Sequence, residues 1–590
     1  LQTSGEVMQA YLAGATPVAL REARLPLAGT IVSWEPGSEL VARRIFDPSE
    51  DRYLLAHTLG RTVSRSDPDL PALPLMPLAM TLEILAEAAA CLLPERVVTG
   101  LRDVRAHRWL AWAEAPRTLE TTARVVAAAD GQALVRTEVR EVGDDGVAEA
   151  PAAEATVVLG DAFAAAPPPI APDLEGGEPS RWEPAQLYDE AMFHQASWQG
   201  VRDVHVVAPR GARARLEVPP RAGLLRSTPA PEFVLDPVAL DAAGQVIGFW
   251  AADRLDRGRV VFPFRLAALE LFGPPRPEGE ALECVAAIEL VGDALVRSDI
   301  DVIDGAGRCL MRLTGWEDKR FDVPDRFRPL TVPAELTPLS APWDAPAATQ
   351  AALGAACRRL DARIPADGAL WKGVWARRVL GRRERAHFDE LRMPESRQLE
   401  WLGARTAAKE AVATLLRARH GVDLLPADVE IVPDERGAPV VVAAGTQALD
   451  VVPVVSLAHA GGESVALAAL VPAGSGVRLG IDVERIRSRP PGFEQAALTA
   501  PERAVLDRVP AAAREEWVLR CWCVKEAAGK AVGSGIAPGP NAPVVLAVDP
   551  EAGEAMVAVG DRRLRVHSGR DAELVYATTV WHDDGGPDEP

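Results

Sequence analysis

Two long apolar segments constrain the fold of this chain more than any other feature. Residues 77–93 read PLAMTLEILAEAAACLL, and residues 237–255 read PVALDAAGQVIGFWAADRL. In the first segment only Glu83 and Glu87 carry a charge. A helix that is apolar on nearly every side is normally buried on every side. We therefore expect two helices, each enclosed by other parts of the chain.

Strand-like runs accompany both predicted helices. The runs lie at residues 30–34, 39–45, 118–128, 132–142 and 153–159, and again at 201–207, 212–218, 259–264, 267–272, 281–290, 295–303 and 309–316. Such runs are typical of strands that place one face on a core. Both segments thus show the same arrangement, a sheet around one buried helix. This repetition predicts a double hot-dog fold.

Two proline-rich stretches divide the chain. Residues 162–180 and 322–347 lack apolar periodicity, as linkers do. The predicted domains are a first hot-dog at 25–161, a second at 181–321 and a third segment at 348–581. Because the chain begins with Leu1, residues 1–24 are interpreted as the end of an upstream linker in a longer polypeptide. Residues 582–590 are predicted to be a disordered acidic tail.

The third segment mixes helices and strands. Helical patterns lie at residues 349–360, 382–392, 398–419 and 511–532, and strand-like runs at 429–432, 440–442, 452–456, 465–471, 477–483, 555–559, 564–567 and 574–581. This mixture predicts an α/β or α+β unit. The fold class expected for the whole chain is α+β.

The charge balance excludes several classes of function. Asp and Glu number 84 and Lys and Arg 64, which gives a net charge of −20. An acidic chain is repelled by nucleic acids and anionic membranes, because both are polyanions. No apolar run reaches the roughly 18–20 residues that span a bilayer. Six cysteines in 590 residues are too few for a disulfide framework, which predicts a cytoplasmic protein.

Two carboxylates share one face of a predicted strand in VRLGIDVERI, residues 477–486. Side chains alternate along a strand, so Asp482 and Glu484 point away from the apolar face that carries Ile481 and Val483. Adjacent carboxylates repel each other unless they are solvated or a cation lies between them. Magnesium is commonly held by a few carboxylates together with substrate phosphates.

A predicted helix adds a third carboxylate and a lysine. Trp522, Glu526 and Lys530 recur every fourth residue and share one helical face. The chain has only five lysines, and Lys525 and Lys530 are two of them. On its own, the Glu526–Lys530 spacing is equally typical of a surface ion pair on a buried helix.

Taken together these stretches resemble the 4′-phosphopantetheinyl transferases, in the pseudodimeric branch that includes the surfactin-synthetase type. The matching motifs are GIDVE at 480–484 and WCVKEA with Lys530 at 522–530. RTAAKEA at 405–411, DERGAPVV at 434–441 and SLAHAGG at 456–462 support them, in the same order as in the family. The resemblance covers about residues 348–581. It implies transfer of phosphopantetheine from coenzyme A to a serine of an acyl carrier protein.

The resemblance also implies roles for individual residues. Asp482, Glu484 and Glu526 would hold Mg²⁺ against the pyrophosphate, Glu526 would accept the serine proton, and Lys530 and Lys525 would bind phosphate oxygens. Further coenzyme A contacts are expected from Ser456, His459, Arg405 and Arg436. Two interpretations of Lys409 stay open: it is a coenzyme A ligand, or it is a residue of the helix surface.

The first two segments contain one candidate base and one candidate acid. His57 follows a strand-like run in YLLAHTLG. Asp236 and Pro237 read as the N-cap and first residue of the second apolar helix, on which Asp241 and Gln245 then share a face. With no cation in the local sequence, a buried Asp241 is expected to have a raised pKa and to donate a proton. A structural Asp–Gln pair is the alternative, and His194 is interpreted as a structural or tunnel-lining residue.

These pieces resemble the polyketide synthase dehydratases. The matching stretches are His57 with Gly60, LPLMP at 73–77, LYDEAMFHQASWQG at 187–200, FPFRLAALELFGP at 262–274, and Asp241 with Gln245. The chain departs from the family at Ala56, Arg61 and Asp236, where Asp, Gly and His are usual. Those departures are similar to iterative enediyne-type or polyunsaturated-fatty-acid-type systems. The order of the two domains also resembles that of the enediyne-type synthases.

The second resemblance implies dehydration of a β-hydroxyacyl thioester on a carrier protein. His57 would remove the α-proton, and Asp241, oriented by Gln245, would protonate the departing hydroxyl. The expected partners are an acyl carrier protein and upstream polyketide synthase domains, with homodimerisation as a further expectation for hot-dog folds. Two alternatives stay open for the double hot-dog, a cyclising product-template domain and an inactive scaffold for carrier docking.

Overall fold

The computed structural model describes residues 25–60, 62–112, 115–129, 131–186, 188–189, 192–255, 259–322, 338–364, 369–535 and 542–583. The chain divides into two units, one formed by residues 1–61 and 72–332 and the other by residues 62–71 and 333–590. The predicted linker 1–24, most of the predicted linker 322–347 and the tail beyond residue 583 lie outside the described residues. Residues 162–180 contain no helix and one isolated bridge, between Glu178 and Val207.

Unit 1 contains one large antiparallel sheet. Its described strands follow the order β1-β2-β6-β7-β8-β5-β11-β14-β13-β12-β10-β9. Their bounds are β1 Thr30–Glu35, β2 Glu39–Phe46, β5 Val97–Ala106, β6 Arg117–Ala129, β7 Gln132–Val142, β8 Ala148–Gly160, β9 Val201–Ala208, β10 Gly211–Glu217, β11 Arg259–Leu271, β12 Ala281–Val291, β13 Leu295–Ile303 and β14 Cys309–Asp322. A short hairpin of β3 (Thr58–Leu59) and β4 (Leu73–Pro74) lies outside this sheet.

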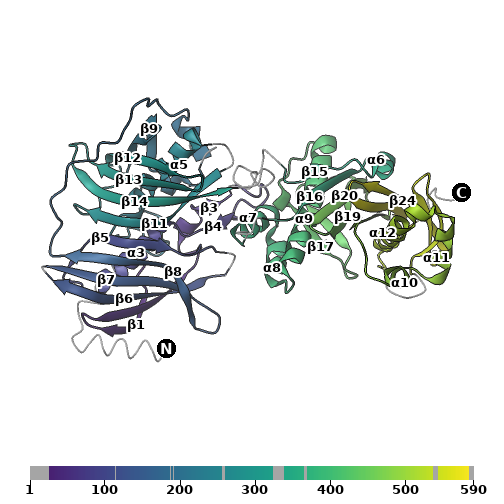
Figure 1. Cartoon of the computed structure of the whole chain (residues 1–590), viewed down its shortest axis with the longest axis horizontal. Helices are drawn as coiled ribbons and strands as arrows, with labels where there is room; N and C mark the ends of the chain where they lie inside the picture. Colours follow the sequence, from purple (N-terminus) through teal and green to yellow (C-terminus); the bar gives the residue numbers. More distant parts are fainter. Residues whose placement is uncertain are drawn as a thin grey trace. The chain divides into compact units, whose positions relative to one another are not determined.

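Each half of the sheet encloses one helix. Helix α3 (Leu78–Leu92) packs on β2 and β5–β8, and α5 (Pro237–Arg254) packs on β9–β13 (Figure 1). Every residue of α3 from Ala79 to Leu92 is buried, including both glutamates. At the start of α5 the Asp236 side chain accepts a hydrogen bond from the Ala239 amide, with Pro237 next to it. The two buried helices and the predicted double hot-dog plan are confirmed.

Strand β5, which the sequence analysis missed, joins the two halves. It pairs with β8 of the first half and with β11 of the second, in a register that places Arg105 opposite Arg265 and Gly100 opposite Glu270. A Cβ atom at Gly100 would lie 2.1 Å from the carbonyl oxygen of Leu269. Glycine therefore allows the close strand approach that makes one continuous sheet.

Unit 2 consists of two similar layers, each a sheet covered by a long helix (Figure 1). In the first layer α9 (Glu395–His420) packs on the order β15-β16-β20-β19, formed by Ala341–Pro342, Ala356–Asp361, Glu463–Pro472 and Val451–Ala460. In the second α12 (Arg514–Val532) packs on β21-β25-β24-β23-β22, formed by Val477–Arg485, Leu574–His582, Arg562–Asp571, Glu554–Val559 and Val544–Asp549. Strands β19 and β21 bring the layers together.

The remaining elements of unit 2 are shorter. They are α6 Ala347–Leu353, α7 Ala369–Val379, α8 Arg382–Glu390, α10 Phe493–Ala497, α11 Ala500–Val505, and the β17–β18 hairpin of Val429–Pro433 and Pro439–Ala443. The predicted helix at 349–360 is wrong beyond Leu353, because residues 356–361 form β16 and pair with the buried strand β20. Sheet pairing overrides the alanine-rich local preference there.

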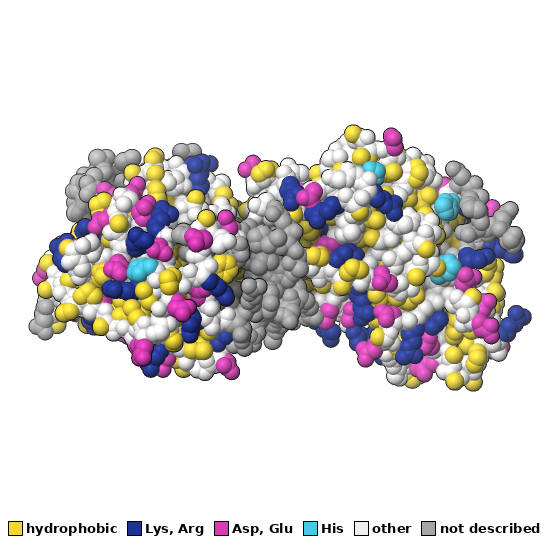
Figure 2. All heavy atoms as spheres, turned by 90° about the horizontal axis from the view of Figure 1, so that it is seen from above, with side chains coloured by type: hydrophobic (Ala, Val, Ile, Leu, Met, Phe, Trp, Pro, Cys, Tyr) yellow, Lys and Arg dark blue, Asp and Glu magenta, His cyan; other side chains and the backbone are white. Residues whose placement is uncertain are grey.

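The described surface is mixed in charge. On the face shown in Figure 2, acidic and basic side chains are interspersed over both units, with hydrophobic side chains between them. None of the described helices is long and apolar enough to cross a bilayer.

Candidate active sites

Unit 1 contains a cavity of about 190 Å³ in which the predicted base and acid meet. His57 comes from the turn before β3, and Asp241 and Gln245 come from one face of α5. The cavity walls are largely apolar and include Met76, Leu110, Met192, Phe262 and Trp316. Residues from both hot-dog halves therefore build a single site.

Two glycines of α5 shape the wall of this cavity. A Cβ atom at Gly244 would lie 2.9 Å from the Trp316 ring, and one at Gly248 would lie 3.0 Å from Cε of Met192. Larger side chains there would push Trp316 and Met192 away from the helix. The small residues that give α5 a weak helix preference thus let the wall pack closely.

The tautomer of His57 is set by the backbone. Its Nδ1 lies 2.9 Å from the carbonyl oxygen of Leu75. Because a carbonyl can only accept, Nδ1 carries the proton and Nε2 carries a lone pair. Burial, followed by the charge of nearby His194, lowers the pKa of His57 from 6.5 to about 4. The ring is therefore neutral at neutral pH and able to act as a base.

Asp241 is oriented by a hydrogen-bond chain that begins at Tyr188. The Val201 amide donates to the Tyr188 oxygen (2.8 Å), and the Tyr188 hydroxyl donates to Gln245 Oε1 (2.7 Å). Gln245 Nε2 then donates to the carbonyl of Trp198 and to Asp241 Oδ2, both at 2.7 Å. Since both amide hydrogens and the amide oxygen are used, Gln245 has one orientation and presents an N–H to Asp241.

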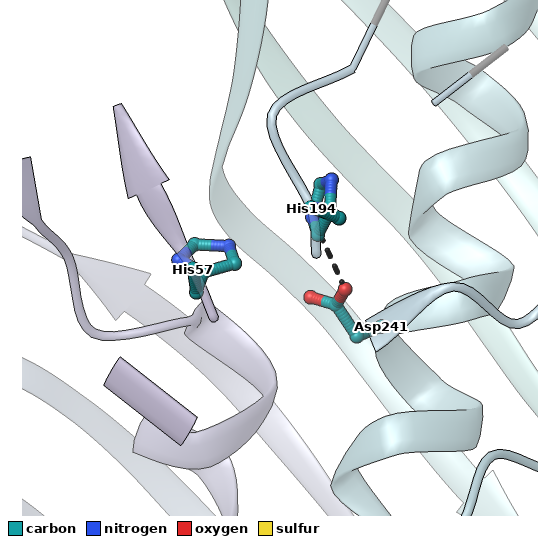
Figure 3. Close-up of side chains that lie close together, drawn as sticks. All are labelled: His57, His194 and Asp241. Atoms are coloured by element: carbon teal, nitrogen blue, oxygen red, sulfur yellow. Dashed lines mark ion pairs between the residues drawn. The ribbon is translucent and has the colours of Figure 1, made fainter. Parts of the chain in front are cut away.

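His194 joins this pair. Its Nε2 lies 3.3 Å from Asp241 Oδ2; the dashed line in Figure 3 marks this ion pair. The segment is held by an isolated bridge between His194 and His57 and by a 2.9 Å hydrogen bond from the Gln195 amide to the Ala56 carbonyl. In the described part of the chain, this is the one set of three His, Cys, Asp or Glu side chains whose ligand atoms lie within 4.8 Å of one another.

The raised pKa expected for Asp241 is wrong. Burial alone would raise it, but the hydrogen bond and charge of His194 and the charge of His57 lower the pKa of Asp241 below its usual value. The local sequence around Asp241 contains no such cation, because His194 is 47 positions away in the chain. Asp241 is thus a carboxylate that accepts hydrogen bonds.

A second acidic residue, Asp318 of β14, lines the same cavity and was not predicted. Burial raises the pKa of Asp318 to about 8, and the Trp316 indole N–H donates to its Oδ2 at 2.9 Å. It is therefore mostly protonated at neutral pH. The signal available in the sequence was an acidic residue within an otherwise strand-like run.

In unit 2 the predicted carboxylates face helix α12. Leu479, Ile481 and Val483 of β21 lie in a hydrophobic core, so Asp482 and Glu484 lie on the opposite face. A Cβ atom at Gly480 would lie 2.0 Å from the carbonyl oxygen of Ala527 on α12. Glycine therefore allows the helix backbone to lie directly against the strand.

The close approach brings Lys530 and Glu526 beside the strand carboxylates. Lys530 Nζ donates to Asp482 Oδ1 at 2.8 Å and to the carbonyls of Ile481 (3.0 Å) and Leu457 (3.2 Å). Burial, together with repulsion among the carboxylates, raises the pKa of both Asp482 and Glu526. Carboxylate oxygens are the ligands that a hard divalent cation prefers, but among the described residues the oxygens of Asp482, Glu484 and Glu526 do not lie within 4.8 Å of one another.

A cavity of about 610 Å³ lies beside Glu484. Its charged lining consists of Glu400, Glu484, Arg363, Arg397, Arg487 and Arg489, together with His459. Arg489 also donates to Glu484 Oε2 at 2.7 Å. His459 was predicted here, but the four arginines were not, because they come from three separate stretches of the sequence.

The other predicted cofactor contacts lie elsewhere. Arg405 stacks on Trp401 with 3.5 Å between guanidinium carbon and ring centroid, and Arg436 lies in the β17–β18 turn; neither lines the cavity. Ser456 is buried, and its hydroxyl accepts a 3.0 Å hydrogen bond from the Ile481 amide. That bond links β19 to β21.

Two predicted lysines are engaged inside the protein. Lys525 donates to Glu502 at 3.0 Å and to the Ala497 carbonyl at 3.1 Å, away from the Asp482 face of α12. Lys409 is completely buried and pairs with Glu384. Lys409 is therefore not a residue of the helix surface.

Comparisons with known proteins find a match in each of the two units. Residues 166–326 match the family model for the polyketide synthase dehydratase N-terminal domain, and residues 478–577 match the 4′-phosphopantetheinyl transferase superfamily. The holo-[acyl-carrier-protein] synthase of Geobacillus kaustophilus (strain HTA426) is 48% identical over 66 residues, which are 11% of this chain and 50% of that protein. The chain thus spans about half the length of this curated relative.

Solved structures are similar to this chain at low identity. The dehydratase domain of the polyketide PpsC from Mycobacterium tuberculosis is 21% identical, covering 50% of this chain and 99% of that domain, with a TM-score of 0.39. The dehydratase domain from the CurF module of curacin polyketide synthase is 16% identical, with the same coverages and TM-score. By the two family models, residues 166–326 match a polyketide synthase dehydratase domain and residues 478–577 match the 4′-phosphopantetheinyl transferase superfamily, in one chain.

Proposed function

We propose that unit 1 removes water from a β-hydroxyacyl thioester on an acyl carrier protein. The observation that carries this proposal is the meeting of His57 and Asp241 within 4.8 Å in one apolar cavity. Catalysis by proton transfer requires such direct or water-bridged reach. An inactive docking scaffold would not need a neutral base and an oriented carboxylate at the same point.

The dehydration uses groups already in place. Nε2 of His57 takes the proton from Cα, the electron pair of that bond forms the Cα–Cβ double bond, and the Cβ–O bond breaks. The departing oxygen receives the proton held between His194 Nε2 and Asp241 Oδ2, which lie 3.3 Å apart, and leaves as water; the proton on His57 then returns to that pair. The apolar walls around Met76 and Trp316 exclude bulk water and accommodate an acyl chain.

We further propose that unit 2 transfers phosphopantetheine from coenzyme A to a carrier serine. Asp482, Glu484 and Glu526 would hold a divalent cation, with Mg²⁺ the ion that their oxygen ligands suit. When bound, the cation neutralises charge on the pyrophosphate. Glu526 accepts the proton of the serine hydroxyl, whose oxygen forms the new bond to phosphorus while the bond to 3′,5′-ADP breaks.

The arginine-lined cavity supplies the coenzyme A site in this proposal. Arg363, Arg397, Arg487 and His459 offer donors for phosphate oxygens beside Glu484. Lys530 lies one helical turn from Glu526 and adds a compact positive charge. Ser456 then contributes by fixing β21 through the Ile481 amide, rather than by touching the cofactor.

The proposed partners are a carrier protein, which both domains act on, and upstream polyketide synthase domains. A cytoplasmic location fits this role, and no disulfide joins any of the six cysteines. A homodimer through the hot-dog unit belongs to the same proposal.

The test is a pair of reciprocal variants assayed by intact mass. With apo carrier, coenzyme A and Mg²⁺, the full chain should add one phosphopantetheine, and Asp482→Ala should abolish this addition while dehydration of a preloaded carrier continues. His57→Phe should have the reverse effect. If either variant, still folded, removed both activities, the proposal of two separate sites would be wrong.

A further inference from the structure

One carboxylate of the arginine-lined cavity has no role in the proposed transfer. Glu484 is a proposed ligand of the cation, whereas Glu400 of helix α9 lines the same cavity without such a role. The Glu400 side chain is only 8% exposed. A carboxylate repels phosphates, because both are anionic. Glu400 is therefore unfavourable for phosphate binding unless its contacts with the protein compensate.

The turn between β19 and β20 forms part of the cavity lining. It consists of Gly461 and Gly462, whose φ angles are +58° and +87°. A two-residue hairpin turn of this kind needs positive φ angles at both positions, which glycine adopts without strain. Because glycine restricts its own backbone least, contacts from outside the turn determine how firmly it is held.

Glu400 contacts both sides of this turn. Its Oε1 accepts a 2.9 Å hydrogen bond from the Gly462 amide, and its Oε2 lies 3.2 Å from Nδ1 of His459. His459 is the penultimate residue of β19 and pairs with Ser464 of β20. One carboxylate therefore spans the end of the hairpin, from the strand before the turn to the glycine that ends it.

Two arginines of the cavity are connected to the same contacts. Arg397 donates to Glu400 Oε2 at 3.0 Å from one turn earlier on α9. A Cβ atom at Gly462 would lie 2.9 Å from Cγ of Arg363, so the Arg363 side chain packs directly on the turn. Three side chains that are proposed to bind phosphate thus contact either Glu400 or the turn that Glu400 holds.

The backbone of α9 is fixed at this point as well. The Ser464 hydroxyl donates to the Glu400 carbonyl oxygen at 3.1 Å. Three residues further along the helix, a Cβ atom at Gly403 would lie 2.6 Å from Oγ of Ser464. Glycine therefore lets α9 pack closely on β20, and this packing places the Glu400 carboxylate beside the turn.

We propose that Glu400 is a positioning residue of the coenzyme A cavity, which holds His459 and the β19–β20 turn in place for ligand binding. This inference rests on the proposed transferase function and adds no chemical step to it. If Glu400 acts through these contacts, its removal weakens the binding of coenzyme A even though a negative charge is lost. A carboxylate that acted only through its charge would have the opposite effect, because its removal would favour an anionic ligand.

Calorimetric titration of the full chain with coenzyme A and Mg²⁺ tests the sign of this effect. No transfer occurs in this experiment, because it contains no carrier. Glu400→Ala should raise Kd about 10-fold, and Glu400→Gln, which keeps an oxygen for the Gly462 amide, should raise it only about threefold. Glu435→Ala removes an exposed glutamate outside the cavity and should leave Kd unchanged.

A double-mutant cycle tests whether Glu400 acts through His459. In a His459→Ala background, Glu400→Ala should raise Kd by about threefold or less, because changes at residues that share a contact are not additive. In transfer assays with wild-type His459, Glu400→Ala should raise KM for coenzyme A and leave kcat within about threefold. A residue that only stabilised the fold would lower the thermal midpoint without this dependence on His459.

The results that would overturn the inference are specific. Unchanged or tighter binding of coenzyme A by Glu400→Ala would contradict it, and so would an undiminished effect of Glu400→Ala in the His459→Ala background. If Glu400→Ala does not fold, Glu400→Gln is judged by the same sign of the change in Kd. If wild-type protein binds no coenzyme A, the proposed transferase function itself fails, whereas tight wild-type binding with unchanged variants would overturn this inference alone.

Discussion

The site in unit 1 and the site in unit 2 hold their ionisable groups in opposite ways. Around Asp241 the protein itself orients the two central groups: a backbone carbonyl sets the tautomer of His57, and the Tyr188–Gln245 chain orients the carboxylate. Around Asp482 the carboxylates repel one another. Asp482 forms an ion pair with Lys530, and Glu484 forms one with Arg489. The comparison teaches that the first site is preorganised for proton transfer, whereas the second is arranged to receive charged ligands.

The largest expected effect tests whether the second site depends on the close packing of α12. Gly480→Ala would place a methyl group 2.0 Å from the Ala527 carbonyl, so α12 has to move away from β21. We expect transferase activity to fall by about 100-fold or more, since catalytic groups tolerate little displacement. Carrier modification by intact mass measures this, and dehydration should be unchanged.

Gly273→Ala is the matched control for that substitution. A Cβ atom at Gly273 would meet nothing within 4 Å. Normal transferase activity in Gly480→Ala would mean that the strand–helix contact does not position Asp482 and Glu526.

The next prediction compares how the two sites respond to acid. A base works only when it is deprotonated, so dehydration should persist on acidification until the pH approaches the His57 pKa of about 4, well below the usual 6.5. Without a cation, burial and Asp482 raise the pKa of Glu526, so transfer at limiting Mg²⁺ should already decline at a pH above the usual glutamate value of 4.5, and saturating Mg²⁺ should move that decline to lower pH.

Profiles of kcat/KM against pH, on protein shown to stay folded, check this order. If the pKa values of His57 and Glu526 were unperturbed, acidification would stop dehydration, which depends on the histidine, before it stopped transfer. That ordinary order, with dehydration half lost near pH 6.5, would contradict the environment described for His57.

A smaller effect tests the arginine-lined cavity. Arg487→Gln should raise KM for coenzyme A about 3- to 10-fold with a smaller change in kcat, because one charge-assisted phosphate contact is lost. Arg436→Gln should leave KM unchanged, since this residue does not line the cavity. Steady-state kinetics with varied coenzyme A measures KM for both variants. A raised KM in Arg436→Gln with an unchanged KM in Arg487→Gln would instead favour Arg436, the contact predicted from sequence.

The smallest effect concerns the hydrogen-bond chain of the first site. Tyr188→Phe leaves the Val201 amide and Gln245 Oε1 without their partner. Unsatisfied buried groups of this kind destabilise by about 1–3 kcal/mol. We expect a lower free energy of unfolding of unit 1 and an approximately twofold lower kcat for dehydration, consistent with an Asp241 that is less well oriented. Denaturant unfolding and kinetics measure the two effects, and an unchanged kcat would show that Gln245 does not need Tyr188.

Much of the fold could be predicted from the sequence where local pattern and burial agree. The apolar helices α3 and α5 follow from their composition, and the Asp236–Pro237 cap from local turn chemistry. Strand β5 was missed because Arg102, Asp103 and Arg105 interrupt its apolar residues, and its existence depends on pairing with β11, a long way along the chain. Strand β16 was mistaken for a helix because its formation also depends on pairing with a strand far along the chain, β20.

The candidate sites show the same division. His57, Asp241, Asp482, Glu526 and Lys530 stand in short motifs, so sequence spacing finds them. The pairing of His194 with Asp241 and the gathering of four arginines at one cavity arise only from folding. The pKa of Asp241 was predicted in the wrong direction because it depends on a neighbour that local sequence does not reveal.

One measurement tests the account most directly. The full chain is incubated with an apo carrier domain, Mg²⁺ and a β-hydroxyacyl coenzyme A, and the carrier is followed by intact mass. The account expects the carrier first to gain one β-hydroxyacyl phosphopantetheine and then to lose one water, with the second step absent in His57→Phe and both absent in Asp482→Ala. A carrier that stays unmodified, or that gains the acyl arm and never loses water with wild-type protein, would contradict it.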